Sequence, residues 1–102
     1  MEVKTDLYYI EFISENPEFT GCVIDKYGTK EWCLNGKLHR TDGPAVEGVD
    51  GYKEWHLNGK LHRTDGPACE WANGYKEWYL NGKRLTEEEW KKAVSSTCNE
   101  TK

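Results

Sequence analysis

Residues 28–45 read Gly-Thr-Lys-Glu-Trp-Cys-Leu-Asn-Gly-Lys-Leu-His-Arg-Thr-Asp-Gly-Pro-Ala, and residues 51–68 read Gly-Tyr-Lys-Glu-Trp-His-Leu-Asn-Gly-Lys-Leu-His-Arg-Thr-Asp-Gly-Pro-Ala. The offset is 23 residues, and 17 of the 23 positions aligned between 28–50 and 51–73 are identical. A third copy begins at Gly74 and diverges after Lys83. A fixed period of this length indicates one supersecondary unit stacked on itself, because a single unit cannot bury its apolar face alone.

The composition of the whole chain bounds its class. A length of 102 residues fits one domain, 1–102. The formal net charge of -4 argues against nucleic acid as a direct partner. No apolar run is long enough to span a membrane, and the N-terminus lacks the pattern of a secretion signal, so we expect a cytoplasmic protein. Cys22, Cys33, Cys69 and Cys98 include no C-x-x-C pair and could form disulfides in a secreted protein. Nothing else in the sequence indicates secretion, so we expect reduced thiols.

Two hairpin signals recur in every copy. The first is Asn-Gly, at 35–36, 58–59 and 81–82. The second is a residue followed by glycine, at 27–28, 50–51 and 73–74. Asn-Gly and Asp-Gly favour the two-residue type I′ turn, in which both central residues have positive φ. We therefore expect each copy to be a β-hairpin unit with two-residue turns at both ends.

Two-residue turns fix the strand register, and this register places one tryptophan per copy in a common row. About Asn58-Gly59, Trp55 should face His62. About Asp50-Gly51, Val46 should face Trp55. The expected rows are Val23–Trp32–His39, Val46–Trp55–His62 and Cys69–Trp78–Leu85. We therefore expect structural roles for Trp32, Trp55 and Trp78, as a buried spine, and for His39 and His62, which pack beside the indoles.

The two ends of the chain differ from its middle, as a stack of units requires. Residues 1–20 are expected to form an N-terminal strand cap, with a strand over the β-branched and aromatic residues 7–13. Residues 86–96 are expected to form a short capping helix, because Thr86 and Glu89 match a capping box and Trp90 would cover the last hairpin. Residues 97–102 have no pattern and are expected to be a frayed tail.

The predicted fold is therefore all-β, an antiparallel meander of stacked 23-residue β-hairpin repeats over residues 21–85 with a short C-terminal capping helix. A meander that does not close leaves unpaired backbone groups along its edges. Pairing of these edges into a homodimer is an expectation that follows from this architecture.

Tyr52, Trp55 and the run Asn58-Gly-Lys-Leu-His62 resemble the MORN repeat. They are still more similar to the MORN-like variant with a Trp-x-x-Asn-Gly-Lys-Leu-His-Arg-x-Asp-Gly-Pro-Ala core, which is found in short proteins of bacteria, phages and giant viruses. The resemblance covers roughly residues 21–85. It implies a β-hairpin scaffold used in protein–protein contact, with no catalytic residues to carry over.

Two constellations could carry chemistry. The first is His39, Arg40 and Asp42, repeated one copy later, which could form an acid–base pair or bind phosphate. Because Leu85 takes the histidine position in the third copy, we interpret this position as a packing position. The second is the set of Cys and His residues, considered as zinc ligands. Their spacings match no zinc motif, and Cys33, His56 and Tyr79 occupy equivalent positions in the three copies. We therefore expect no enzyme activity, no metal and no cofactor.

A set of acidic and aromatic residues on the face opposite the tryptophan row is the candidate partner-binding surface. In the expected register, Glu47 lies opposite Glu54, and Glu70 lies opposite Glu77. Tyrosine gives contact area at low entropic cost, and carboxylates favour a basic partner surface. An ordinary solvated face is the alternative interpretation. The predicted binding residues are Glu47, Tyr52, Glu54, His56, Glu70, Tyr75, Glu77 and Tyr79.

These observations predict a non-enzymatic protein-binding module that acts by occupying the surface of a basic protein partner. The most specific version is a phage or mobile-element inhibitor of a bacterial defence system, similar in style to anti-CRISPR proteins. A host MORN-type scaffold or antitoxin-like adaptor is the alternative. A weaker alternative is a nucleotide-binding or hydrolytic protein that uses the His-Arg-x-Asp corners.

Overall fold

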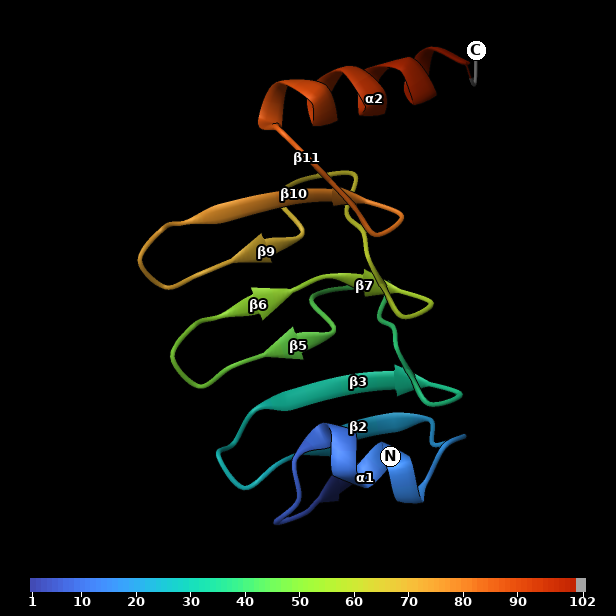
Figure 1. Ribbon diagram of the computed structural model, residues 1–102, viewed down its shortest axis with the longest axis vertical. Helices are drawn as coiled ribbons and strands as arrows, with labels where there is room; N and C mark the ends of the chain where they lie inside the picture. Colours follow the sequence, from blue (N-terminus) through green and yellow to red (C-terminus); the bar gives the residue numbers. More distant parts are fainter. Residues whose placement is uncertain (101–102) are drawn as a thin grey trace.

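The computed structural model describes residues 1–100, with side chains as far as residue 95 (Figure 1). The strands follow one another along the long axis of a molecule that measures 44 × 30 × 19 Å. The elements are β1 (Glu2–Lys4), α1 (Tyr9–Glu15), β2 (Gly21–Ile24), β3 (Lys30–Leu34), β4 (Lys37–Leu38), β5 (Val46–Glu47), β6 (Lys53–Glu54), β7 (His56–Leu57), β8 (Lys60–Leu61), β9 (Cys69–Glu70), β10 (Lys76–Leu80), β11 (Lys83–Leu85) and α2 (Glu87–Glu100).

Most of these strands belong to one sheet of order β1-β2-β3-β5-β6-β9-β10-β11, with β4 paired to β3, while β7 and β8 form a separate hairpin. Every recorded strand pair is antiparallel except β1 with β2, which is parallel. The strand-rich, largely antiparallel sheet and the C-terminal helix agree in outline with the sequence prediction. The parallel strand β1 was not predicted.

The Asn-Gly turns have the expected conformation. Asn35, Asn58 and Asn81 have φ of 51°, 52° and 51°, and the glycine after each also has positive φ. This is the pattern of a type I′ turn. His56 pairs with Leu61 and Trp78 with Leu85, so the register predicted about these turns is confirmed.

The second set of loops differs from the prediction. Gly51 has a φ of 96°, but Asp50 is not among the residues with positive φ, so the turn is not type I′. The Gly48 amide donates to the Tyr52 carbonyl at 2.8 Å, which leaves a three-residue loop in place of a two-residue turn. Such loops end in a left-handed residue, here the glycine. The register therefore slips by one residue, and Val46 faces Glu54 rather than Trp55.

This slip moves the tryptophans to the other side of the sheet, because successive strand residues point to opposite faces. Val23 now faces Glu31, Val46 faces Glu54 and Cys69 faces Glu77. The predicted row of buried, stacked indoles is therefore wrong. The buried apolar residues are mostly small: Cys22, Val23, Cys33, Ala45, Val46, Ala68, Cys69 and Trp90.

Each indole on the opposite face is half-buried and has a cover of its own. The guanidinium carbon of Arg40 lies 3.9 Å from the ring centroid of Trp32, and that of Arg63 lies 3.7 Å from Trp55. These are cation–π distances. Trp78 has no such arginine, and the ring of Trp90 from α2 lies 4.6 Å from it instead. The indoles thus stabilise the fold by packing against these side chains rather than against one another.

The three cysteines with described side chains are free and buried. Burial raises the pKa of the Cys33 thiol to about 11 and that of the Cys69 thiol to about 12. Both thiols are therefore protonated and unreactive at neutral pH. The side chain of Cys98 lies outside the described residues.

His39 and His62 tie each copy to the next. The Nδ1 atom of His39 accepts a hydrogen bond of 2.9 Å from the amide of Asn58, and Nδ1 of His62 accepts one of 3.0 Å from Asn81. Each bonded amide belongs to the Asn-Gly turn of the following copy. Leu85 can replace the histidine in the third copy because the chain continues from there into α2 rather than into another hairpin. The sequence predicted packing beside the indoles for these histidines; the structure shows in addition that each accepts a hydrogen bond that links two hairpins.

We expect His62→Leu to lower the free energy of unfolding by about 1–2 kcal/mol, because the Asn81 amide loses its acceptor. Urea unfolding at pH 7 measures this change. Thr64→Ala is the control, since Thr64 is exposed in the loop that follows and should change stability by less than about 0.5 kcal/mol. Equal stability of His62→Leu and the wild type would contradict a linking role.

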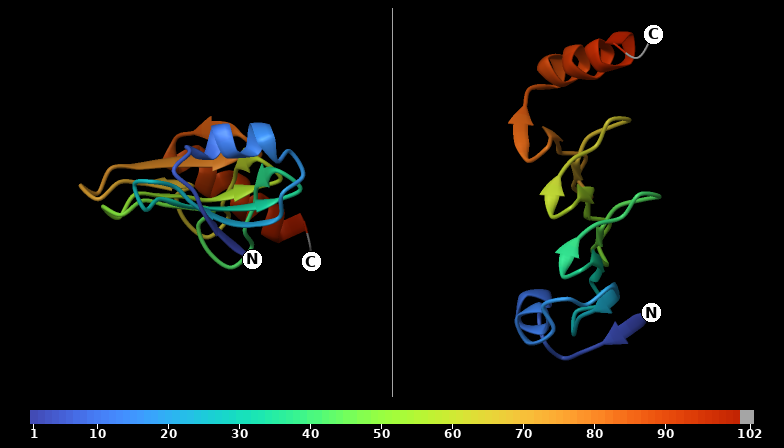
Figure 2. Two further views of the ribbon diagram at one scale, coloured as in Figure 1. Left: turned by 90° about the horizontal axis from the view of Figure 1, so that it is seen from below. Right: turned by 90° about the vertical axis from the view of Figure 1, so that its right-hand side faces the viewer.

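The N-terminal cap contains helix α1 in addition to β1, so the strand predicted over residues 7–13 is wrong. Tyr9, Phe12 and Ile13 are half-buried at helical spacing, while Ile10 is exposed. The ring of Phe12 packs edge-on against Phe19 at 5.1 Å. Figure 2 shows α1 against one broad side of the sheet, beside the first copy. These contacts favour the helix over the strand that the β-branched residues suggested.

The C-terminal helix is confirmed and is longer than predicted. Thr86 and Glu89 form the capping box, with the Thr86 amide donating to Oε1 of Glu89 at 2.9 Å and the Glu89 amide donating to Oγ1 of Thr86 at 3.1 Å. The helix continues to Glu100, so a frayed tail from residue 97 is wrong for residues 97–100. Residues 101–102 lie outside the described residues.

Candidate functional site

The Lys-Glu-Trp motif of each copy places a glutamate on the side of the sheet that holds Val23, Val46 and Cys69. The residues two before and two after each glutamate lie on the same side, because strand side chains alternate. We call this side the glutamate face. It consists of Thr29, Glu31 and Cys33 in the first copy, Tyr52, Glu54 and His56 in the second, and Tyr75, Glu77 and Tyr79 in the third.

In the second copy, three side chains form one hydrogen-bonded group. The Tyr52 hydroxyl donates to Oε2 of Glu54, and Nε2 of His56 lies 2.7 Å from Oε1 of the same carboxylate. Burial raises the pKa of Glu54, but the hydrogen bonds from His56 and Tyr52 outweigh burial and lower it overall. Glu54 is therefore ionised at neutral pH and is held in place on both sides.

In the third copy, Glu77 is held in the same way. The hydroxyls of Tyr75 and Tyr79 donate to its two oxygens at 3.2 and 3.3 Å. Arg84 lies 3.4 Å from Oε2 of Glu77 and donates to the Tyr75 hydroxyl at 3.0 Å. Tyr75 is 49% exposed, so this part of the glutamate face reaches solvent.

The first copy lacks these partners. Glu31 is 8% exposed, and its Oε1 atom has no hydrogen bond. Helix α1 covers this part of the face, with Tyr9 next to Cys33 and bonded through its hydroxyl to the Gly36 carbonyl at 3.2 Å. Burial, with smaller contributions from Asp25 and Glu54, raises the pKa of Glu31 to about 8. Glu31 is therefore mostly protonated at neutral pH.

The eight residues predicted to bind a partner do not all lie on one face of the sheet. Tyr52, Glu54, His56, Tyr75, Glu77 and Tyr79 lie together on the glutamate face. Glu47 and Glu70 lie on the opposite face, directly across from lysines: Glu47 faces Lys53, and Glu70 faces Lys76. The predicted apposition of Glu47 with Glu54 and of Glu70 with Glu77 is wrong, because it relied on two-residue turns.

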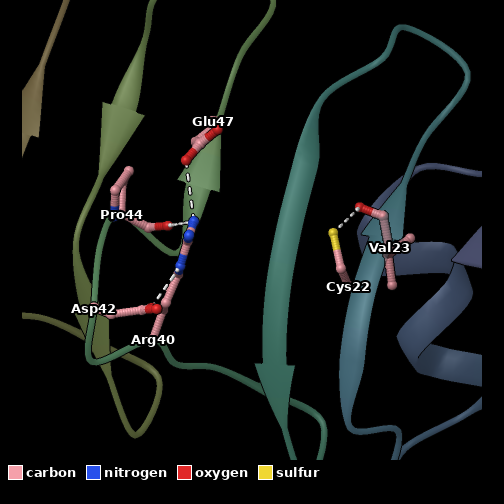
Figure 3. A network of polar contacts seen from close by, with 6 residues as sticks. All are labelled: Cys22, Val23, Arg40, Asp42, Pro44 and Glu47. Atoms are coloured by element: carbon pink, nitrogen blue, oxygen red, sulfur yellow. Dashed lines mark hydrogen bonds and ion pairs between the residues drawn. The ribbon is translucent and has the colours of Figure 1, made fainter. Parts of the chain in front are cut away.

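The His-Arg-x-Asp corners are occupied by contacts within the chain. Figure 3 shows Arg40, whose Nε donates to Oδ1 of Asp42 at 2.9 Å and whose Nη1 donates to the Pro44 carbonyl and to Glu47 at 3.1 and 3.0 Å. Arg63 makes the equivalent contacts one copy later. The two arginines therefore stabilise the corner loops through hydrogen bonds. His39 and His62 accept hydrogen bonds from turn amides. Among the residues with described positions, no group of three or more His, Cys, Asp or Glu could hold a metal.

We expect Arg63→Lys to lower the free energy of unfolding by about 1–2 kcal/mol, because an ammonium group cannot stack on Trp55 and bridge Asp65, Glu70 and the Pro67 carbonyl at once. Thermal or urea unfolding measures the change. Arg84→Lys is the matched control: the Arg84 side chain is 60% exposed, and its replacement should cost less than about 0.5 kcal/mol. Similar losses for the two variants would contradict a special role for the stacked arginine.

A hollow at the loop end of the glutamate face was missed by the sequence analysis. Its volume is about 430 Å³, and it lies beside a row of three aromatic rings. The ring centroid of Trp71 is 5.1 Å from that of Tyr52 and 5.0 Å from that of Tyr75. The lining residues are Thr29, Val46, Gly48, Val49, Asp50, Tyr52 and Trp71.

A comparison of the copies with each other could have found this region. Six of the 23 positions differ between residues 28–50 and 51–73. Four of the six lie at or beside the three-residue loops: 29 and 52, 48 and 71, 49 and 72, and 50 and 73. Differences therefore gather at one end of the hairpins, while the framework stays constant.

No protein-family model, curated protein or solved structure matches this chain. Within the described part of the chain, no helix is both long and apolar enough to cross a membrane.

Proposed function

We propose that this chain is a non-enzymatic protein-binding module that acts by occupying a partner's surface with the open part of its glutamate face. The observation that carries this proposal is the contrast between constant and varied positions. Residues that close turns, stack on indoles or link hairpins are the same in the first two copies, while the loop end of one face carries different side chains. This is the arrangement that a binding scaffold needs.

The chemistry of the open face supports a protein as the partner. Tyr52, Trp71 and Tyr75 form an aromatic row, and tyrosine and tryptophan are enriched where protein interfaces hold most of their binding energy. Glu54 is ionised, and the chain carries a net charge of -4. A partner with a basic surface therefore fits best, because complementary charge raises the association rate and excludes wrong partners.

The similarity to MORN-like units supports the same class of function. In its most specific form, the proposal is a phage or mobile-element inhibitor of a bacterial defence system, built as a stack of 23-residue hairpins. A host scaffold or antitoxin-like adaptor would use the same surface. The nucleotide-binding or hydrolytic alternative has less support, because the side chains of its corners already make hydrogen bonds within the chain. These side chains are Arg40, Arg63, His39 and His62.

Site-specific photo-crosslinking in bacterial cells tests the proposal. A photoreactive phenylalanine at Tyr75 samples the open glutamate face, and the same residue at the exposed Lys53 samples the opposite face. We expect a stoichiometric basic protein to be crosslinked from position 75 and not from position 53. Crosslinks only from position 53, or none from either position in cells that express the chain, would overturn the proposal.

A further inference from the structure

The three loops at the left edge of Figure 1, residues 25–29, 48–52 and 71–75, share one backbone conformation. In each loop the first amide donates to the fifth carbonyl, at 3.1, 2.8 and 2.9 Å in chain order. In each, the fourth residue is a glycine with positive φ whose amide donates to the first carbonyl. The loops therefore differ mainly in side chains, and the first position is Asp25, Gly48 or Trp71.

In the third loop, the first position supplies a ring that sits between two others. Trp71 lies 5.1 Å from Tyr52, which belongs to the preceding loop, and 5.0 Å from Tyr75, which ends its own loop. The interplanar angles are 54° and 53°. These distances are typical of favourable aromatic pairs. The scaffold can therefore hold an indole between the residues that end two successive loops.

In the second loop, no side chain fills the place that corresponds to the Trp71 ring. The first position is Gly48, and the two residues that end the successive loops are Thr29 and Tyr52. A Cβ atom built on Gly48 would lie 3.0 Å from Oδ1 of Asp50 and 3.3 Å from Cβ of Tyr52, so a side chain at this position would lie beside both residues. The hollow of about 430 Å³ is lined by these same three residues, together with Val46, Val49, Asp50 and Trp71.

We propose that this hollow receives an aromatic side chain of the protein partner, preferably a tryptophan, in the place that Trp71 fills one copy later. The inference rests on the proposed function and names the chemistry of its anchor. The Tyr52 ring and the two valines provide apolar contacts, and the Asp50 carboxylate at the rim accepts a hydrogen bond from an indole N–H or from a basic residue beside the anchor. The volume lies within the range of about 300–1,000 Å³ that is usual for ligand pockets.

The probe for this site is N-acetyltryptophanamide. Its binding to the isotope-labelled full chain is measured by NMR. We expect saturable shifts at the methyl groups of Thr29, Val46 and Val49, with a dissociation constant in the millimolar range because one side chain binds without the rest of the partner. N-acetylleucinamide should cause no saturable shift. Absence of saturable shifts with the tryptophan probe, or shifts centred on the Trp32 and Trp55 side, would overturn the inference.

Gly48→Trp should close the site by copying the third loop. We expect probe affinity to fall at least tenfold while the melting temperature stays equal or rises. Gly48→Ala is the matched control, because it adds a single carbon and leaves the hollow open. Val49→Lys is a second blocking variant that needs no room for an indole, since Val49 is 75% exposed at the rim. Unchanged probe binding in either blocking variant would also contradict the inference.

These results are separable from those for the proposed function. If crosslinking from position 75 captures a partner but the tryptophan probe does not bind, the anchor inference fails and the binding function stands. If the probe binds in the hollow but no protein is crosslinked, the proposed function fails and the hollow is an aromatic-binding site without that partner.

Discussion

Trp90→Ala is expected to lower the free energy of unfolding by about 3–5 kcal/mol, which is the range for removing a large aromatic side chain from a packed site. Trp90 is 8% exposed, and its ring lies 4.6 Å from that of Trp78. Its Nε1 atom donates to the Arg63 carbonyl at 2.8 Å. The substitution therefore removes the cover of the last indole and the bond that fastens α2 to the preceding copy.

Calorimetry or urea unfolding of the full chain measures this loss of stability. Two further variants separate the contributions of the ring, the N–H group and the rest of α2. Trp90→Phe keeps a ring against Trp78 but removes the N–H, so we expect a loss of about 1–2 kcal/mol from the unpaired Arg63 carbonyl and the smaller ring. Lys91→Ala, on the exposed side of α2, loses only an exposed ion pair with Glu87 and should cost less than about 0.5 kcal/mol. A Trp90→Ala variant as stable as Lys91→Ala would show that α2 does not cap the sheet.

The sequence alone predicted the local structure correctly wherever a short sequence motif has one preferred conformation. Asn-Gly predicted the turns at Asn35, Asn58 and Asn81, and the pairing on either side of them followed. The capping box predicted the start of α2. In both cases the residues that decide the geometry are adjacent in the chain, so no distant contact could change the outcome.

The sequence was insufficient where one pattern permits two conformations. A residue followed by glycine suits both a two-residue type I′ turn and a three-residue loop that ends in a left-handed glycine. The loop ending at Gly51 takes the second form, and the one-residue slip moves Val46 from Trp55 to Glu54. Residues 7–13 are similarly ambiguous, and contacts of Phe12 with Phe19 favour the helix.

The candidate site shows the same division. Tyr52, Glu54 and His56 were grouped correctly, because alternate residues of one strand share a face whatever the register. Glu47 and Glu70 were grouped with them only through the register, and they lie on the other side with Arg40 and Arg63. Trp71 was missed because its partners, Tyr52 and Tyr75, come from two different loops.

Glu31 provides the second large prediction, because it is a buried carboxyl group without the partners that hold Glu54. Its pKa is about 8 in the folded chain, against an ordinary value of 4.5. Between these two values the folded state holds a proton that the unfolded state has released, so stability falls as the pH rises from 4.5 to about 8. At pH 7 this cost is on the order of 3 kcal/mol, since each unit is worth about 1.4 kcal/mol.

Glu31→Gln removes the titration while keeping the shape of the protonated side chain. We expect this variant to be more stable than the wild type by on the order of 2–3 kcal/mol at pH 7–8 and nearly equal to it near pH 4. Urea unfolding at pH 4, 6 and 8 measures the difference. A constant difference between the two proteins across this range would contradict a buried, protonated Glu31.

Glu54→Gln is the matched control, because it makes the same substitution at the equivalent position one copy later. Here the folded pKa is lowered, so the carboxylate adds stability above its unfolded pKa and loses it as the pH falls through the folded value. We expect Glu54→Gln to cost about 1.5–3 kcal/mol at pH 7, because Tyr52 and His56 lose a charged acceptor. Its effect should shrink toward pH 3. Two identical substitutions on one face should thus change stability in opposite directions at neutral pH, and the presence or absence of a tyrosine and a histidine two residues away decides the sign.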